Sequence, residues 1–218
     1  FRSPLLIACR VVMLCVLRVI QWIRRVRWTV RGTEHLQLES SPFIFAANHQ
    51  SHVDTHVILD ALPKEFRNHT AVAAAFDHFA DTDGTSIRKK VLQFVVASLW
   101  HAFGIERFKS PLRSIRTMHS LVESGWSIVI YPEGTRSRTG DIASFKPGLA
   151  VIAKRSGRPV IPVHIDGGLR VLPEATYIPR RGIITVSFGQ PLHFDQDESS
   201  AEFMSRVEHA VRVMNQKT

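Results

Sequence analysis

The chain has few cysteines and no repeated or low-complexity segments, which are the features that disulfide-rich, repeat and disordered proteins depend on. It contains two cysteines in 218 residues, Cys9 and Cys15, both in the amino-terminal stretch. They do not form a disulfide framework, and neither lies near a polar motif, which argues against a thiol nucleophile. Internal repeats, low-complexity tracts and long linkers are absent, which argues against a repeat protein or a disordered chain. The chain also begins with Phe1 rather than methionine, as expected of a processed or truncated piece of a longer protein.

Acidic residues are missing from the start of the chain. None occurs before Glu34, and the whole sequence carries a formal charge of +9. A basic balance suits either nucleic acid or an anionic membrane surface. Because the densest basic cluster adjoins an apolar stretch and no nucleic-acid-binding motif is present, we expect a phospholipid membrane as partner and no nucleic acid.

Length and hydrophobic content, at 44%, suit one sizeable core. Short apolar runs that are typical of strands alternate with segments of helical apolar spacing. We therefore expect a single α/β domain over residues 26–218, with a mostly central mixed sheet flanked by helices. Strands are expected near residues 27–31, 42–47, 70–75, 103–107, 127–131, 159–165 and 182–188. Helices are expected near residues 52–61, 86–99, 111–124, 147–156 and 199–215.

Residues 1–25 form a separate apolar and basic segment. Arg10 and Arg18 interrupt its apolar run, and burying both in a bilayer costs about 5–7 kcal/mol, which the aliphatic side chains only about offset. One face of its helical wheel collects the polar side chains of Arg10, Arg18, Gln21 and Arg25. We expect an amphipathic helix in the membrane interface, on the cytoplasmic face of the cell membrane. A helix packed on the core and a spanning helix are the alternatives.

A histidine and an aspartate lie five residues apart in NHQSHVD, residues 48–54. A neutral imidazole removes a hydroxyl proton best when its other nitrogen donates to a carboxylate, so His49 is a candidate general base and Asp54 its orienting acid. On one continuous helix the two side chains would lie about 140° apart. We therefore expect His49 in the turn after a strand and Asp54 in the first turn of the next helix.

Other interpretations of this segment stay open. The pair is a plain structural hydrogen bond, or His49, His52 and His56 hold a metal ion for a hydrolase, since zinc prefers such ligands. The spacing is not His-Glu-x-x-His, and Asp54 cannot both orient the base and bind a metal. Ser51 is a poor candidate nucleophile because Gly-x-Ser-x-Gly is absent.

A glycine turn carrying an acid and a guanidinium follows further along the chain. Residues 127–131 form an apolar run typical of a buried strand, Pro132 ends its hydrogen-bond ladder, and Gly134 permits a tight turn. Ligands bind at such carboxyl ends of strands in α/β sheets. The guanidinium of Arg136 suits phosphate oxygens, and Lys146 adds a point charge. A polar loop with a salt bridge is the alternative.

Together these segments resemble the glycerolipid acyltransferase family, which includes lysophosphatidic acid and glycerol-3-phosphate acyltransferases. His49 with Asp54 matches the family's first block, His-x4-Asp, and residues 133–136 match its third, Glu-Gly-Thr-Arg. Residues 160–164 resemble its fourth block, an apolar strand with a central proline. The order and spacing agree, and the resemblance covers roughly residues 25 to 190.

The second block of that family is similar to residues 104–108, GIERF, in a shortened form. Its arginine helps to bind the acceptor phosphate, which implies that role for Arg107. Glu106 stands where the family usually has aspartate, and the apolar pair before it is missing, so the match is looser here.

The resemblance implies direct transfer of a fatty acyl group from acyl-CoA or acyl carrier protein to the sn-2 hydroxyl of 1-acyl-glycerol-3-phosphate, giving phosphatidic acid. It implies no acyl-enzyme intermediate, no metal and no cofactor, with His49 and Asp54 as the catalytic residues. The substrate-binding residues are expected to be those of the matching blocks, with Lys146 added for its charge: Glu133, Gly134, Thr135, Arg136, Arg107 and Lys146. Glycerol-3-phosphate or another lyso-lipid as acceptor, a metal-dependent hydrolase, and a membrane-binding module with an inactive site are the alternatives.

Overall fold

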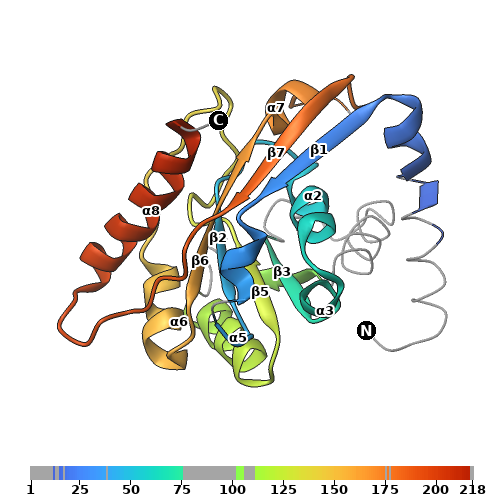
Figure 1. Cartoon of the computed structure of the whole chain (residues 1–218). Helices are drawn as coiled ribbons and strands as arrows, with labels where there is room; N and C mark the ends of the chain where they lie inside the picture. Colours follow the sequence, from blue (N-terminus) through green and yellow to red (C-terminus); the bar gives the residue numbers. More distant parts are fainter. Residues whose placement is uncertain are drawn as a thin grey trace, which may run out of the picture.

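The computed structural model describes residues 12, 15–16, 18–37, 39–75, 102–105, 111–174, 176 and 178–216. Its strands are β1 (Val26–Arg31), β2 (Ile44–Ala47), β3 (Thr70–Ala75), β4 (Ala102–Ile105), β5 (Ser127–Ile130), β6 (Val160–Asp166) and β7 (Gly182–Phe188). Within these described ranges they form one sheet in the order β1-β7-β6-β2-β5-β3-β4 (Figure 1). Only the β6–β7 pair is antiparallel there, so the predicted mixed sheet is confirmed.

Helices cover both faces of this sheet. The described helices are η1 (Thr33–Gln37, 3-10), α2 (Asp54–Ala61), α3 (Lys64–Arg67), α5 (Pro111–Glu123), α6 (Gly148–Ser156), α7 (Gly168–Val171) and α8 (Ser200–Gln216). The longer ones match the predicted helices closely. The sequence did not predict η1, α3 and α7, because a helix of one turn is too short to show a periodic pattern. The helix predicted near residues 86–99 lies outside the described residues.

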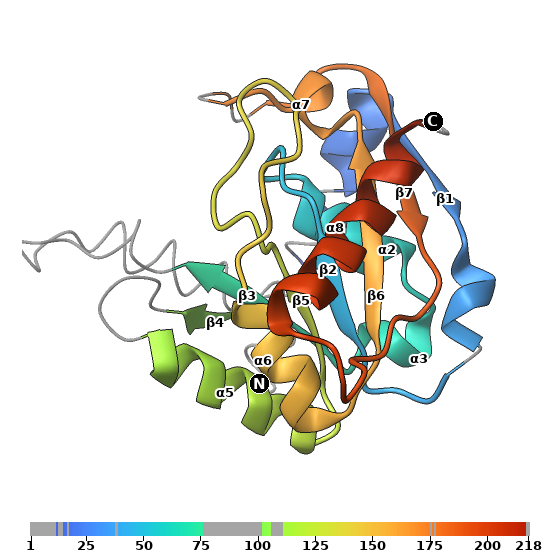
Figure 2. The same cartoon turned by 90° about the vertical axis from the view of Figure 1, so that its left-hand side faces the viewer.

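The alternation of side chains along β2 divides the core into two layers. Phe45 and Ala47 face a cluster that includes residues of η1 and α2, whereas Ile44 and Ala46 face a cluster built with α5, α6 and α8. All four side chains are fully buried, because β2 lies in the middle of the sheet. Figure 2, in which α8 lies in front of β6 and β2, shows the second helix layer. The described residues thus form the predicted single α/β domain.

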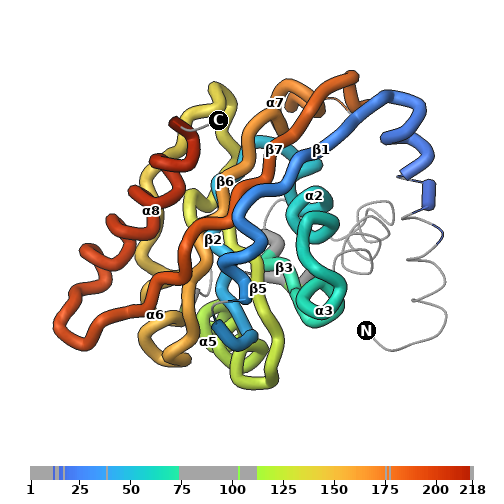
Figure 3. The backbone as a smooth tube through the Cα atoms, viewed as in Figure 1, coloured from blue at the N-terminus to red at the C-terminus, as the bar shows by residue number. Residues whose placement is uncertain are grey.

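One edge of the sheet holds an end of each of the seven described strands. β2, β3, β4, β5 and β6 run parallel, so their carboxyl ends meet there. β7 runs antiparallel to β6, and β1 runs parallel to β7, so the amino ends of β1 and β7 lie at the same edge. Figure 3 shows α7, which follows β6, close to these two amino ends. This edge is called the site edge below.

The chain is helical at the described positions between residues 12 and 23. Arg18 pairs with Asp60 of α2 at 3.3 Å, and the Arg24 guanidinium donates to the carbonyl of Pro179 at 2.8 Å. These contacts attach the segment to the domain. Within the part of the chain that the structure describes, no helix has the length and apolarity needed to cross a bilayer.

Candidate active site

His49 and Asp54 lie where the sequence predicts. His49 is in the loop after β2, and Asp54 is the first residue of α2. The Nδ1 atom of His49 is 2.9 Å from Oδ2 of Asp54, which is fully buried, whereas 19% of the His49 side chain is exposed. Because Nδ1 faces the carboxylate, Nε2 is the ring nitrogen that a substrate hydroxyl can approach.

The Asp54 carboxylate is held by its own loop. Its Oδ2 atom also accepts the backbone N–H groups of Gln50, at 2.6 Å, and Ser51, at 2.7 Å. Its Oδ1 atom is buried and has no hydrogen-bond partner among the described residues. Gly168, the first residue of α7, lies so close that a side chain there would overlap Oδ1. The carboxylate therefore has one position that fits, and in it Oδ2 faces His49.

Glu133 connects the glycine turn to the histidine loop. Its Oε1 atom accepts the backbone N–H of His49 at 2.7 Å, and its Oε2 atom accepts that of Ala143 at 2.8 Å. The side chain is buried, and this burial raises the pKa of the carboxyl, while the two backbone donors oppose the rise. The carbonyl of His49 in turn accepts the N–H of Ser137 at 2.8 Å. The His49 backbone is thus fixed from both sides by the segment after β5.

Two supporting residues were missed by the sequence reasoning. The Tyr131 ring stacks on the His49 imidazole with centroids 4.0 Å apart, and its hydroxyl bonds Thr55 at 2.7 Å. Burial raises the pKa of Tyr131, so the phenol stays protonated. The amide of Asn48 bridges the backbone of Ile165 in β6, at 2.7 and 2.9 Å. The available signals were an aromatic residue at the end of a strand and an amide beside the histidine.

Two basic side chains lie at the glycine turn. Gly134 has φ +75°, and a side chain added to it would come within 2.6 Å of the Lys146 ammonium, so glycine makes room for that charge. Partial burial, followed by the charge of Arg136, lowers the pKa of His52, so this guanidinium is close enough to act on the His52 ring. Thr135 is exposed at the turn. Arg107 lies outside the described residues.

Two alternative interpretations of the histidine segment, a metal site and a Ser51 nucleophile, find no support in the described residues. There, no three histidine, cysteine or acidic side chains are grouped to hold a metal ion, so His49, His52 and His56 do not form a ligand set. His56 is buried and packs against Trp28 in a T-shaped arrangement, with ring centroids 6.1 Å apart. The hydroxyl of Ser51 donates to the carbonyl of Leu172 at 2.6 Å, which commits it to a structural bond.

This combination of a mixed α/β sheet, a histidine–aspartate pair and a Glu-Gly-Thr-Arg turn is the one expected of acyltransferases. Comparison with known families agrees with that class. The family model described as Acyltransferase matches residues 27–166, which is more than half of the chain and includes both parts of the site. The chain therefore belongs to the Acyltransferase family.

The relatives carry more specific names. The chain is 26% identical over 167 residues to a chloroplastic 1-acyl-sn-glycerol-3-phosphate acyltransferase of Arabidopsis thaliana, covering 75% of this chain and 43% of that protein. It is 25% identical over 175 residues to a probable 1-acyl-sn-glycerol-3-phosphate acyltransferase of Mycoplasma genitalium, covering 75% and 62%. The chain spans about half the length of the curated relatives that it matches.

A solved structure shares the fold. The crystal structure of the 1-acyl-sn-glycerophosphate acyltransferase PlsC from Thermotoga maritima superposes with a TM-score of 0.70 at 24% identity, covering 92% of this chain and 75% of that one. At this identity the likeness shows the fold alone. It agrees with the α/β architecture described above.

Proposed function

We propose that this protein is an O-acyltransferase that moves a fatty acyl group from an acyl thioester to the sn-2 hydroxyl of 1-acyl-glycerol-3-phosphate. The observation that carries the proposal is the His49–Asp54 pair, with Nδ1 on the carboxylate and the imidazole partly open to solvent. The names of the Arabidopsis and Mycoplasma relatives support the choice of acceptor.

The proposed chemistry is a direct transfer. Nε2 of His49 takes the proton of the acceptor hydroxyl while its oxygen attacks the thioester carbonyl. The tetrahedral intermediate collapses, the carbon–sulfur bond breaks, and the thiolate receives a proton from the imidazolium. Asp54 holds the ring orientation and balances the imidazolium charge, because its buried carboxylate stays 2.9 Å from Nδ1. The N–H of Gly134 donates to the Tyr131 carbonyl at 3.0 Å, so the backbone N–H groups of Glu133 and Thr135 are the proposed donors to the oxyanion.

Acceptor recognition is assigned to the basic side chains near the glycine turn. The charge of Arg136 acts on His52, and the Lys146 ammonium lies against Gly134, so both supply the positive charge that a phosphate needs. Arg107 is the third proposed phosphate ligand, on the resemblance of its segment alone. Glu133, whose observed contacts are backbone N–H groups, supports the turn that carries these groups. Acyl-CoA and acyl carrier protein are both suitable donors, and glycerol-3-phosphate or another lyso-lipid is the alternative acceptor.

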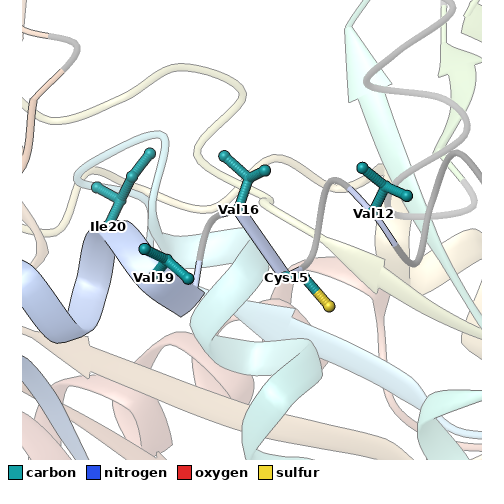
Figure 4. A pocket seen from close by; sticks show the side chains of 5 residues that line it. All are labelled: Val12, Cys15, Val16, Val19 and Ile20. Atoms are coloured by element: carbon teal, nitrogen blue, oxygen red, sulfur yellow. The ribbon is translucent and has the colours of Figure 1, made fainter.

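The amino-terminal segment is the proposed membrane contact, on the cytoplasmic face of the membrane. Figure 4 shows the apolar pocket lined by Val12, Cys15, Val16, Val19 and Ile20. Val12, Val16 and Ile20 lie four residues apart, so they share one helix face, and all three are exposed. An exposed aliphatic stripe close to several arginines suits a helix lying in the headgroup region.

A turnover assay across acceptors and donors tests this function. Lysophosphatidate, glycerol-3-phosphate and phosphate-free monoacylglycerol are each offered with acyl-CoA or acyl carrier protein, and the wild type is compared with His49→Ala. The expected result is His49-dependent formation of phosphatidic acid. Transfer that persists in a folded His49→Ala protein contradicts the mechanism, and equal activity on phosphate-free acceptors contradicts the acceptor.

A further inference from the structure

Two segments far apart in the sequence meet at the site edge. Val26 pairs with Gly182 where β1 and β7 begin, and the Arg24 guanidinium bonds the Pro179 carbonyl at 2.8 Å. Residues 22–27 and 178–183 therefore form one continuous surface, which we name the rim. Figure 1 shows β1 and β7 starting side by side at this corner of the molecule.

The rim combines exposed apolar side chains with positive charge. Trp22 is 81% exposed, and Ile178 and Ile183 are 65% and 59% exposed. The basic members of the rim, all exposed, are Arg24, Arg25, Arg27, Arg180 and Arg181. Neither segment contains an acidic residue. Large apolar groups exposed among arginines match a surface that is anionic outside and apolar beneath.

The rim is connected to the site. The backbone N–H of Arg180 donates to the carbonyl of Val171 in α7 at 2.7 Å. The first residue of the same helix, Gly168, lies against Asp54. Because β1 and β7 begin at the edge where β2 and β6 end, the rim and His49 lie at the same edge of the sheet.

We infer that the rim is a second membrane contact, formed by the start of β1 and β7 together with the last residues of the amino-terminal segment, and distinct from the apolar stripe of the amino-terminal helix. Its arginines bind anionic phospholipid headgroups, and Trp22, Ile178 and Ile183 enter the interface beneath them. The site edge then faces the layer that holds a lipid acceptor. The inference rests on the proposed function for that acceptor, but the contact itself is independent of catalysis.

Vesicle binding of the full chain tests the rim. Binding to phosphatidylcholine vesicles with and without phosphatidylglycerol is measured for the wild type and for Arg180→Gln/Arg181→Gln. Loss of each arginine near an anionic surface lowers affinity about 5-fold, so the pair loses roughly 30-fold on anionic vesicles. Ile178→Ser/Ile183→Ser weakens binding to both kinds of vesicle.

The matched control is Arg155→Gln/Arg158→Gln. It removes the same charge at the opposite edge of the sheet, beside the start of β6, and is expected to leave vesicle binding unchanged.

Turnover on a soluble short-chain lysophosphatidate is measured on the same proteins. Rim variants that bind vesicles weakly but retain this turnover support the inference. Vesicle binding equal to the wild type in both rim variants overturns it, as does an equal loss in the control. A dimer in sedimentation that the rim substitutions dissociate assigns the surface to a second copy and also overturns it. A wild type with rim-dependent binding but no acyl transfer supports the rim and contradicts only the proposed function.

Discussion

At the residue scale, the carboxylate of Asp54 explains how a loop histidine is kept in one orientation. A single oxygen, Oδ2, receives three donors: Nδ1 of His49 and the backbone N–H groups of Gln50 and Ser51. An anion satisfies three donors far better than a neutral amide does, and full burial strengthens each bond. The loop backbone thus holds the Asp54 carboxylate in place, and that carboxylate orients the ring of His49, the proposed base.

Removing either member of this pair is expected to abolish most of the activity. His49→Ala and Asp54→Asn should each lower turnover by at least about 10²-fold, because base catalysis is lost in one and the base is misoriented in the other. The double variant should be little worse than His49→Ala, since the two residues act as a unit. Steady-state kinetics on proteins with normal circular dichroism measure this. Additive losses would show that Asp54 works independently of His49.

Gly168 is expected to affect the His49–Asp54 pair because it has no side chain, and not because of its backbone conformation. Its φ is outside the left-handed region, so alanine fits the backbone, but the new methyl group would push on Oδ1 of Asp54. We expect Gly168→Ala to lower kcat by about 10-fold or more with little change in either KM. Gly148→Ala is the matched control, because Gly148 also begins a helix and its Cβ meets nothing. An Asp54→Asn protein that still loses activity on adding Gly168→Ala would contradict this explanation.

At the element scale, the turn after β5 combines support of the His49 backbone with the proposed recognition of substrate. The Glu133 side chain is buried and accepts the backbone N–H of His49, whereas Arg136, three residues later, is partly exposed. One short turn can therefore hold the His49 backbone through Glu133 and place the positive charge of Arg136 where solvent reaches it. This division predicts different kinetic effects for its members, because supporting contacts act on kcat and phosphate contacts act on acceptor affinity.

Arg136→Ala is expected to raise the acceptor KM and leave the donor KM nearly unchanged. A charge-assisted bond to phosphate contributes about 1.5–3 kcal/mol, which corresponds to roughly a 10- to 150-fold change. Arg136→Lys should recover part of the loss, since lysine keeps the charge but not the fork. Arg138→Ala serves as the control, because Arg138 is highly exposed and pairs with Glu174. An acceptor KM that stays constant in Arg136→Ala would remove this residue from phosphate binding.

Two buried histidines, on α2 and β6, give the fold a pH dependence. Burial lowers the pKa of His56 and of His164, and each has a ring nitrogen without a partner among the described residues. Below about pH 6.5 these two histidines bind protons in the unfolded chain but stay neutral in the folded protein. The stability that they contribute is therefore full above that pH and falls as the pH drops. The slope is at most about 1.4 kcal/mol per pH unit for each histidine.

Urea unfolding between about pH 8 and pH 5 measures this effect. The wild type should lose stability progressively below about pH 6.5, and His56→Phe/His164→Val should show a shallower slope. The comparison concerns the slope rather than the absolute stability, because both substitutions also change packing. An unchanged slope in the double variant would assign the acid sensitivity to other groups.

At the scale of the whole molecule, the sequence predicted the strands well because most of them are short apolar runs between turn residues. The run at residues 182–188 matches β7 as the structure has it. The hydrophobic pattern could not predict how these strands pair, because the antiparallel register of β6 and β7 depends on contacts between segments distant in sequence.

The candidate site likewise has features that local sequence spacing predicts and features that only the folded chain shows. The five-residue spacing was enough to place His49 in a loop and Asp54 at the start of α2. By contrast, the bond from the His49 backbone to Glu133 and the stacking on Tyr131 join segments more than eighty residues apart in sequence. No local spacing reports such contacts. The approach of Gly168 to Asp54 was equally hidden, because only the folded chain brings α7 to α2.

The two proposed membrane contacts are expected to respond differently to salt. Attraction between arginines and anionic lipid is screened by salt, whereas burial of aliphatic side chains resists it. Val12→Ser/Val16→Ser/Ile20→Ser removes the exposed stripe of the amino-terminal helix and leaves the rim intact. We expect about 10²-fold weaker binding to neutral vesicles and at high salt, with much of the low-salt binding to anionic vesicles retained. Vesicle flotation across a salt series measures both. If the triple variant binds normally at high salt, the stripe packs against protein rather than lipid.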